Sequence, residues 1–133
     1  DALRCARLNA EQLALHVDWR CGRWFESVWG ERWDLVVSNP PYIAEADAHL
    51  SEGDLPAEPR TALVGGATGL EALQEIICLT PAALIPGGWL LLEHGYDQAE
   101  SVAGMLRDAG FSDVSTRSDW SGQPRITGGQ WAS

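Results

Sequence analysis

The feature that most constrains the fold of this chain is a pair of uninterrupted apolar runs, Leu-Val-Val at 35–37 and Leu-Leu-Leu at 90–92. They lie in the segments WDLVVS (33–38) and GGWLLLEHG (87–95). Runs of this kind are typical of parallel strands that are covered on both faces. A helical pattern separates them, and strands that alternate with helices predict a mostly parallel α/β sheet with right-handed crossovers.

Apolar residues at helical spacing predict three helices, at 1–12, 68–84 and 97–110. The second begins with the capping box Thr68-x-x-Glu71, in which each residue can bond a free backbone N–H of the first turn. Gly110 is placed to end the third helix in the left-handed conformation.

Three further strands complete the expected sheet. Strict alternation of apolar and polar residues predicts a strand at 17–22. Segments 111–119 and 125–131 are predicted to pair as an antiparallel hairpin at a sheet edge, because their connection is too short for a crossover. From about 43 to 67 the sequence is rich in Glu, Asp, Gly and Pro, which predicts a long loop of the kind that is usually functional or disordered.

Charge and composition argue against several classes of function. The 133 residues carry 9 basic and 19 acidic side chains, a net charge of -10, which disfavours a large nucleic-acid footprint. The three cysteines are too widely spaced for a disulfide framework or a zinc site, and the three histidines suggest no metal site either. No apolar run approaches the roughly 18 residues of a membrane span, and no signal peptide opens the chain, so we expect a cytoplasmic protein.

The segment SNPPYI at 38–43 directly follows the first apolar strand. The Asn39 carboxamide oxygen and the Pro40 carbonyl are acceptors in a loop that two proline rings stiffen, and Tyr42 offers a flat aromatic face. Two acceptors above an aromatic ring suit a planar –NH₂ group, and they would stabilise the positive charge that develops as its nitrogen attacks a methyl group.

The alternative interpretation of SNPPYI is a rigid turn with a core tyrosine. The setting favours the functional interpretation, because the segment lies at the carboxyl end of a predicted strand, where α/β sheets bind their ligands.

In these residues the sequence resembles amino-methyltransferases that use S-adenosylmethionine and, among them, the HemK/PrmC family of release factor glutamine methyltransferases. The likeness rests on SNPPYI (38–43), HLSEGDLPAEPRTALVGGATGLE (49–71), GGWLLLEHGYDQAE (87–100) and DWSGQPRITGG (119–129). The NPPY motif is shared with DNA adenine and some RNA methyltransferases, so it indicates a chemistry. The later segments are typical of a smaller group of enzymes and favour the glutamine methyltransferases.

The resemblance implies a Rossmann-like class I methyltransferase sheet, truncated at its N-terminal strands, with 1–133 as a partial catalytic domain. It implies methyl transfer to the glutamine amide in the GGQ motif of class 1 peptide-chain release factors, which act in translation termination. Asn39 and Pro40 would accept hydrogen bonds from that amide, and Pro41 and Tyr42 would complete the substrate site. Neither nucleic acid nor a membrane is implied as a direct partner.

The resemblance also implies a site for S-adenosylmethionine, of which this chain carries only a part. The glycine-rich loop and the acidic ribose-binding residue of the family are absent, and the chain starts at Asp1 inside a predicted helix, so we expect that an N-terminal portion is missing. Asn39 and Trp24 are the expected cofactor contacts, with Arg23 in place of the usual acidic residue.

Other polar and aromatic residues have both a functional and a structural interpretation. Glu58, Glu93 and His94 are expected near the active-site loop or in ordinary structural roles. Large aromatic side chains are usually buried, so the tryptophans at 19, 33 and 89 are expected in the core.

Two alternatives to the glutamine enzyme stay open. One is a nucleic-acid amino-methyltransferase, which would need a basic face. The other is a non-catalytic fragment or interaction module. If its first strands are missing, the sheet has an exposed edge through which two copies can dimerise.

Overall fold

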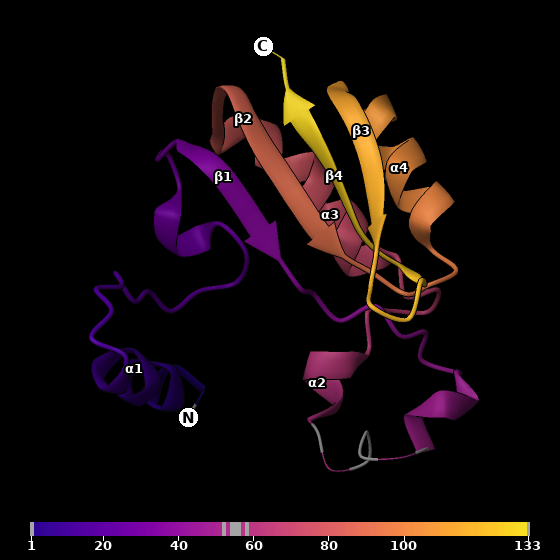
Figure 1. Cartoon of the computed structure of the whole chain (residues 1–133), viewed down its shortest axis with the longest axis horizontal. Helices are drawn as coiled ribbons and strands as arrows, with labels where there is room; N and C mark the ends of the chain where they lie inside the picture. Colours follow the sequence, from indigo (N-terminus) through magenta and orange to yellow (C-terminus); the bar gives the residue numbers. More distant parts are fainter. Residues whose placement is uncertain (1, 52, 54–56, 58, 133) are drawn as a thin grey trace.

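The structure, a computed structural model, describes residues 2–51, 53, 57 and 59–132. Within these residues four strands form one mixed sheet in the order β1-β2-β4-β3 (Figure 1). The strands are β1 (Trp33–Ser38), β2 (Leu84–Glu93), β3 (Phe111–Ser118) and β4 (Pro124–Trp131). β1 and β2 are parallel, and β4 is antiparallel to both β2 and β3. The α/β class and the C-terminal antiparallel pair are confirmed, although the sheet is mixed and not mostly parallel.

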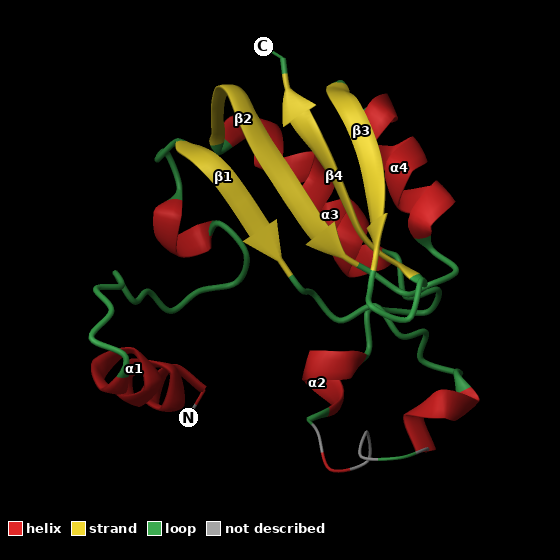
Figure 2. Cartoon of the chain, in the orientation of Figure 1, coloured by secondary structure: helices red, strands yellow, loops and turns green. Residues whose placement is uncertain are grey.

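The helices are α1 (Ala2–Gln12), α2 (Arg60–Leu63), α3 (Glu71–Leu79) and α4 (Ala99–Asp108), with the 3-10 turns η1 (Glu26–Val28), η2 (Ala48–Ser51) and η4 (Thr80–Ala82). Figure 2 shows α3 and α4 on the same face of the sheet, and α1 set apart from the sheet at the end of a long connection. Among the described residues, no helix combines the length and the apolar character that a membrane crossing requires.

The hydrophobic core lies between the sheet and the pair α3 and α4. Its fully buried side chains come from both helices and from alternate positions of β2: Leu73, Ile76, Ile77, Leu84, Leu90, Leu92, Val102 and Leu106. Removal of apolar surface from water stabilises a fold by about 25 cal/mol per Å². This layer therefore fixes the sheet and, with it, the loops at the carboxyl ends of β1 and β2.

The opposite face of the sheet is uncovered within the described residues. In β2, Leu91 is half-buried between the fully buried Leu90 and Leu92. In β1, Leu35 is 51% exposed and Val37 is 66% exposed. The expectation of strands covered on both faces is therefore wrong for this chain, because the helices pack on one side only.

The predicted strand at 17–22 is wrong: this segment has no regular structure. Alternation gives a segment two faces, but a strand also needs a neighbour for its backbone N–H and C=O groups. Instead, Arg20 holds the segment together through the Asp18 carboxylate and the Ser27 carbonyl, at 2.7 and 3.2 Å, and through Glu31.

Thr68 and Glu71 make contact as predicted but do not cap α3, which begins at Glu71 after Leu70 without a side-chain cap bond. The Thr68 N–H donates to Glu71 Oε1 over 2.9 Å, and the Thr68 hydroxyl accepts from the Leu70 N–H over 3.3 Å. The helix is shorter than predicted, since it passes into η4 at Thr80 and β2 begins at Leu84. Gly110, with φ 94°, ends α4 in the left-handed conformation as predicted.

The predicted loop at about 43–67 contains short regular elements, η2 and α2. Ile43 and Val64, at its two ends, form an isolated parallel bridge. This bridge closes the loop at its base and ties it to the segment that follows β1. Glu58 and Asp1 lie outside the described residues.

Candidate active site

The NPPY segment lies at the carboxyl end of β1, beside the carboxyl end of β2 (Figure 1). The parallel register pairs Ser38 with Leu92, so the two strands end at the same edge of the sheet. Because ligands of α/β sheets bind at this edge, the segment occupies the expected location for a site.

Asn39 and Pro40 present two free acceptors. A cavity of about 410 Å³ is lined by Asn39, Pro40, Pro41, Tyr42, Ile43, Ala62 and Leu63. Asn39 is exposed, and in the described part of the chain neither its carboxamide nor the Pro40 carbonyl has a hydrogen-bond partner. The Asn39 carboxamide is therefore open to a donor that enters the cavity, whereas Pro40 is buried and its carbonyl can be reached only from the cavity that Pro40 lines.

Tyr42 joins this cavity to the end of β2. Its ring packs against the hydrophobic core, and its hydroxyl donates to Glu93 Oε1 over 3.3 Å. Burial raises the pKa of the Tyr42 hydroxyl above its ordinary value and the Glu93 carboxylate raises it further, while Arg125 opposes both. The hydroxyl therefore stays protonated at neutral pH.

Two glycines, Gly65 and Gly69, pack closely against the backbone of the NPPY segment and the residue that follows it. The sequence did not indicate this contact. The Ile43 N–H donates to the Leu63 carbonyl and the Gly65 N–H to the Ile43 carbonyl, each over 3.0 Å. A Cβ added at Gly65 would overlap the Pro41 carbonyl, and one added at Gly69 would overlap the Tyr42 carbonyl. Glycine is required at these two positions because the chains approach too closely for a side chain.

Gln98, which sequence reasoning also missed, links the loop after β2 to the NPPY segment. Its Oε1 accepts from the Gly95 N–H over 2.8 Å, and its Nε2 donates to the Tyr42 carbonyl over 2.9 Å. Only a tertiary contact makes this role visible, since 56 positions separate Gln98 from Tyr42.

Trp24 lies beside the site and holds an unsatisfied donor. With a φ of 48° it adopts a left-handed conformation that is uncommon for a large residue. It lines a cavity of about 590 Å³ together with Pro41 and Gly65, whereas Asn39 lines the neighbouring one. Its indole N–H is buried and finds no acceptor in the described part of the chain. A buried donor without a partner is costly, which marks this group as available to a ligand.

Arg23 stays close to Trp24 but is engaged elsewhere. Its guanidinium lies 5.5 Å from the centre of the Trp24 ring and pairs with Glu75 at 2.5 Å. The Arg23 charge is therefore paired with Glu75 of α3, beside the Trp24 ring.

Glu93 and His94 are both at the site, in supporting roles. Glu93 holds the Tyr42 hydroxyl, and His94 is fully buried. The His94 ring lies 2.8 Å from the Gly95 carbonyl through Nδ1 and 2.7 Å from the Thr127 hydroxyl through Nε2. No group of three or more residues that could hold a metal ion occurs in the described ranges.

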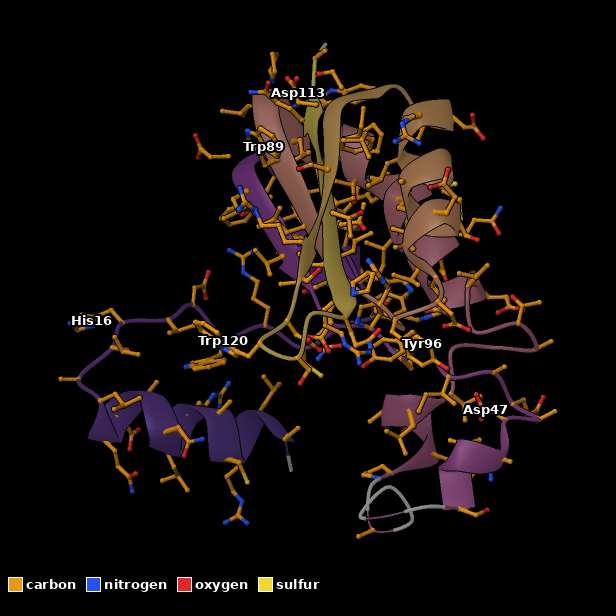
Figure 3. The ribbon with its side chains drawn as sticks, turned by 45° about the vertical axis from the view of Figure 1, so that its right-hand side comes forward. His16, Asp47, Trp89, Tyr96, Asp113 and Trp120 are labelled. Atoms are coloured by element: carbon orange, nitrogen blue, oxygen red, sulfur yellow. The ribbon has the colours of Figure 1, made fainter. Side chains whose placement is uncertain are left out.

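The core placement of three tryptophans is wrong. Trp89 is half-buried and Trp33 is 38% exposed, because the helices cover only the other face of the sheet. Trp19 is half-buried in the irregular segment at 17–22. Figure 3 shows Trp89 and Asp113 toward the end of the sheet that lies opposite Tyr96. None of the three lines a cavity that contains an NPPY residue.

Several curated proteins match the sequence over nearly its whole length. No family model matches the sequence. The chain is 49% identical over 130 residues to the release factor glutamine methyltransferase of Xylella fastidiosa strain Temecula1, which covers 97% of this chain and 47% of that protein. It is also 49% identical over 133 residues to that of Yersinia pestis, with 99% and 48% covered. The chain thus spans about half the length of the curated relatives it matches.

A solved structure confirms the fold class. A methyltransferase from Pyrococcus furiosus superimposes with a TM-score of 0.68 at 17% identity, over 98% of this chain and 58% of that one. The chain therefore has the α/β fold of the corresponding part of that protein.

Proposed function

We propose that this chain, a homologue of the release factor glutamine methyltransferases over nearly its whole length, is the part of such an enzyme that holds the acceptor glutamine. Its substrate would be the glutamine side-chain amide in the GGQ motif of class 1 release factors. Residues 1–133 would form a partial catalytic domain that works where release factors do, in the cytoplasm. The net charge of -10 supports a protein substrate over a nucleic acid.

The observation that carries the proposal is the pair of unpartnered acceptors, Asn39 and Pro40, in one cavity with Tyr42. The two hydrogens of a primary amide would donate to the Asn39 carboxamide oxygen and the Pro40 carbonyl. With both N–H bonds held by the two acceptors in the plane of the amide, the nitrogen lone pair stays perpendicular to that plane, oriented for an in-line displacement.

Amide nitrogen is a poor nucleophile because its lone pair is delocalised. As the new N–CH₃ bond forms, positive charge develops on the nitrogen, and the two acceptors stabilise it more strongly than they stabilise the neutral amide. The bond between the methyl group and the donor sulfur would break as the N–CH₃ bond forms, so that a neutral thioether leaves. The nitrogen would then lose one proton to water, which leaves the N-methylated amide. Tyr42 and the proline rings exclude water from one side of this group and fix its plane.

S-adenosylmethionine would supply the methyl group. Trp24 fits a contact with its adenine, since the indole offers a flat ring and a buried N–H without an acceptor. Asn39 directly follows β1 and lines the acceptor cavity, and its carboxamide would face both ligands.

Methyl-transfer assays test the proposal. The protein expressed from its full coding sequence is incubated with labelled S-adenosylmethionine and with a class 1 release factor, duplex DNA or RNA as acceptor. Label on the release factor alone is expected. Loss of this label when the GGQ glutamine is replaced would identify the glutamine amide as the methylated group. Label on nucleic acid alone would overturn the proposal in favour of a nucleic-acid amino-methyltransferase.

Titration calorimetry with S-adenosylmethionine tests the other alternative, a non-catalytic module. A catalytic role requires saturable binding by the full protein. The absence of binding at any concentration would establish the non-catalytic interpretation.

A further inference from the structure

We infer that Gln98 is a positioning residue for methyl transfer: its side-chain amide fixes the Tyr42 carbonyl and, through it, the two acceptors of the NPPY segment. The inference rests on the proposed function for its kinetic consequence. Its structural content, a clamp between two loops, is independent of that function.

Both ends of the Gln98 carboxamide are assigned by their partners. The Gly95 N–H can only donate, so the atom 2.8 Å away is the amide oxygen, and the Tyr42 carbonyl can only accept, so the atom 2.9 Å away is the amide nitrogen. A side chain with an acceptor and a donor on one planar group is needed here. The Gln carboxamide provides both at neutral pH without a charge, and the Asn carboxamide, which also does, is one methylene shorter.

The loop that carries Gly95 is itself anchored in the core. The Gly95 carbonyl accepts from the Gln98 N–H over 3.0 Å and from His94 Nδ1 over 2.8 Å. His94 is fully buried and reaches the buried Thr127 hydroxyl over 2.7 Å. Because a carbonyl cannot donate, Nδ1 carries the hydrogen, and this chain of bonds ties the Gln98 end of the clamp to β4.

The other end of the clamp has no room to shift. Gly69, with φ 80°, lies against the Tyr42 carbonyl so closely that a Cβ there would overlap it, and the same Cβ would lie 3.0 Å from Gln98 Nε2. The carbonyl is thus confined between a glycine backbone and the Gln98 amide. On its N-terminal side, Pro40 and Pro41 have fixed φ angles, which limits how far the acceptors can turn independently of the Tyr42 carbonyl.

Orientation of this kind affects the chemical step more than binding. A displacement of about 1 Å at a reacting group costs about 100-fold in rate. Loss of the Gln98–Tyr42 bond should therefore lower kcat for methyl transfer. KM for S-adenosylmethionine should stay the same, because Gln98 lines a cavity with Tyr96 and does not line the cavity that contains Trp24.

Gln98→Glu separates the two bonds of the clamp. The carboxylate still accepts from the Gly95 N–H, but it cannot donate to the Tyr42 carbonyl and repels it. At low pH the protonated carboxyl regains a donor. At pH 8 the kcat of Gln98→Glu should be about 10- to 100-fold below that of wild type. The ratio of the two kcat values should rise as the pH falls toward the range in which the introduced carboxyl is protonated.

Amide hydrogen exchange gives a readout that does not depend on activity. In Gln98→Glu at pH 8, the Ile43 and Gly65 amides, which bond across the base of the loop, should exchange faster, while the Gly95 amide keeps its protection. Gln74→Glu on the exposed face of α3 is the matched control for the added charge and should change none of the three.

Unchanged exchange at Ile43 and Gly65 in Gln98→Glu would overturn the clamp, whatever the activity. If the clamp variant exchanges as expected but wild type methylates no release factor, the proposed function fails and the structural clamp stands. A loss of kcat that is independent of pH, with a thermal unfolding temperature far below that of Gln74→Glu, would overturn the positioning role in favour of general destabilisation.

Discussion

The Tyr42 hydroxyl donates a hydrogen bond to Glu93 over 3.3 Å and so joins the residue that closes the NPPY segment to the last residue of β2. Glu93 accepts this bond as a carboxylate, which opposes ionisation of the tyrosine. The pair connects the acceptor cavity to the carboxyl end of β2. The protonation of the Tyr42 hydroxyl depends on the negative charge of Glu93.

Replacement of Glu93 by Gln should lower the pKa of Tyr42 toward its ordinary value, because it removes a negative charge beside the hydroxyl. Ultraviolet titration of tyrosinate measures this. The chain has two tyrosines, so Tyr42→Phe identifies which transition belongs to Tyr42. A Tyr42 transition that stays in place in Glu93→Gln would show that burial alone sets it.

The raised pKa of Tyr42 also determines how stability depends on pH. The folded state favours the neutral phenol, so the contribution to stability is fully present below the ordinary pKa of about 10 and is lost as the pH rises through the folded pKa. Unfolding in denaturant at pH 8 and pH 11 should show a smaller decline for Tyr42→Phe than for wild type. An equal decline would contradict the shift.

Gly65→Ala should destabilise the fold and slow methyl transfer, since its methyl group would overlap the Pro41 carbonyl. Overpacking of this kind costs about 1–3 kcal/mol in the free energy of unfolding. Gly104→Ala in α4 is the matched control: a Cβ there meets no heavy atom within 4 Å, so it should stabilise the helix by about 0.5–1 kcal/mol. Equal unfolding free energies for the two variants would contradict the close contact at Gly65.

Trp24→Phe should weaken binding of S-adenosylmethionine about 3- to 10-fold, because it keeps a flat ring but removes the buried indole N–H that lacks a partner. Titration calorimetry measures the dissociation constant. Trp120→Phe, at a side chain that is 105% exposed, is the control and should bind as wild type does. If both variants bind equally, the Trp24 N–H does not contact the cofactor.

Dimerisation through the β1 edge stays a prediction from the sequence. β1 is an edge strand of the described sheet, and its Val37 is 66% exposed. A lysine on an edge strand disfavours pairing with another edge, so Val37→Lys should convert a dimer to a monomer. Ser115→Lys, on the opposite edge strand β3, serves as control. Sedimentation of wild type as a monomer would reject the edge pairing.

The strands and the motif between them could be predicted from the sequence because their signals are local. The apolar runs at 35–37 and 90–92 identify two adjacent strands, and the prolines that follow Asn39 end the first one. The position of the motif at the carboxyl edge then follows from parallel pairing alone.

What the sequence could not predict depends on partners in space. Alternation at 17–22 meets the local requirement for a strand, but no neighbouring backbone is available to pair with it. The need for glycine at position 65 arises from the Pro41 carbonyl, and the role of Gln98 from the Tyr42 carbonyl, 56 positions away. Such contacts leave no periodic trace in the sequence.

Single-turnover methyl transfer to the release factor by wild type and Asn39→Ala tests most directly whether the NPPY acceptors hold the glutamine amide. Loss of one preorganised hydrogen-bond partner of a developing charge costs about 100- to 1,000-fold in rate, and stability should not change because Asn39 is exposed and unbonded. Asn9→Ala, on exposed α1, is the control. A rate in Asn39→Ala within about twofold of wild type, well below this loss, would contradict the proposed role of Asn39.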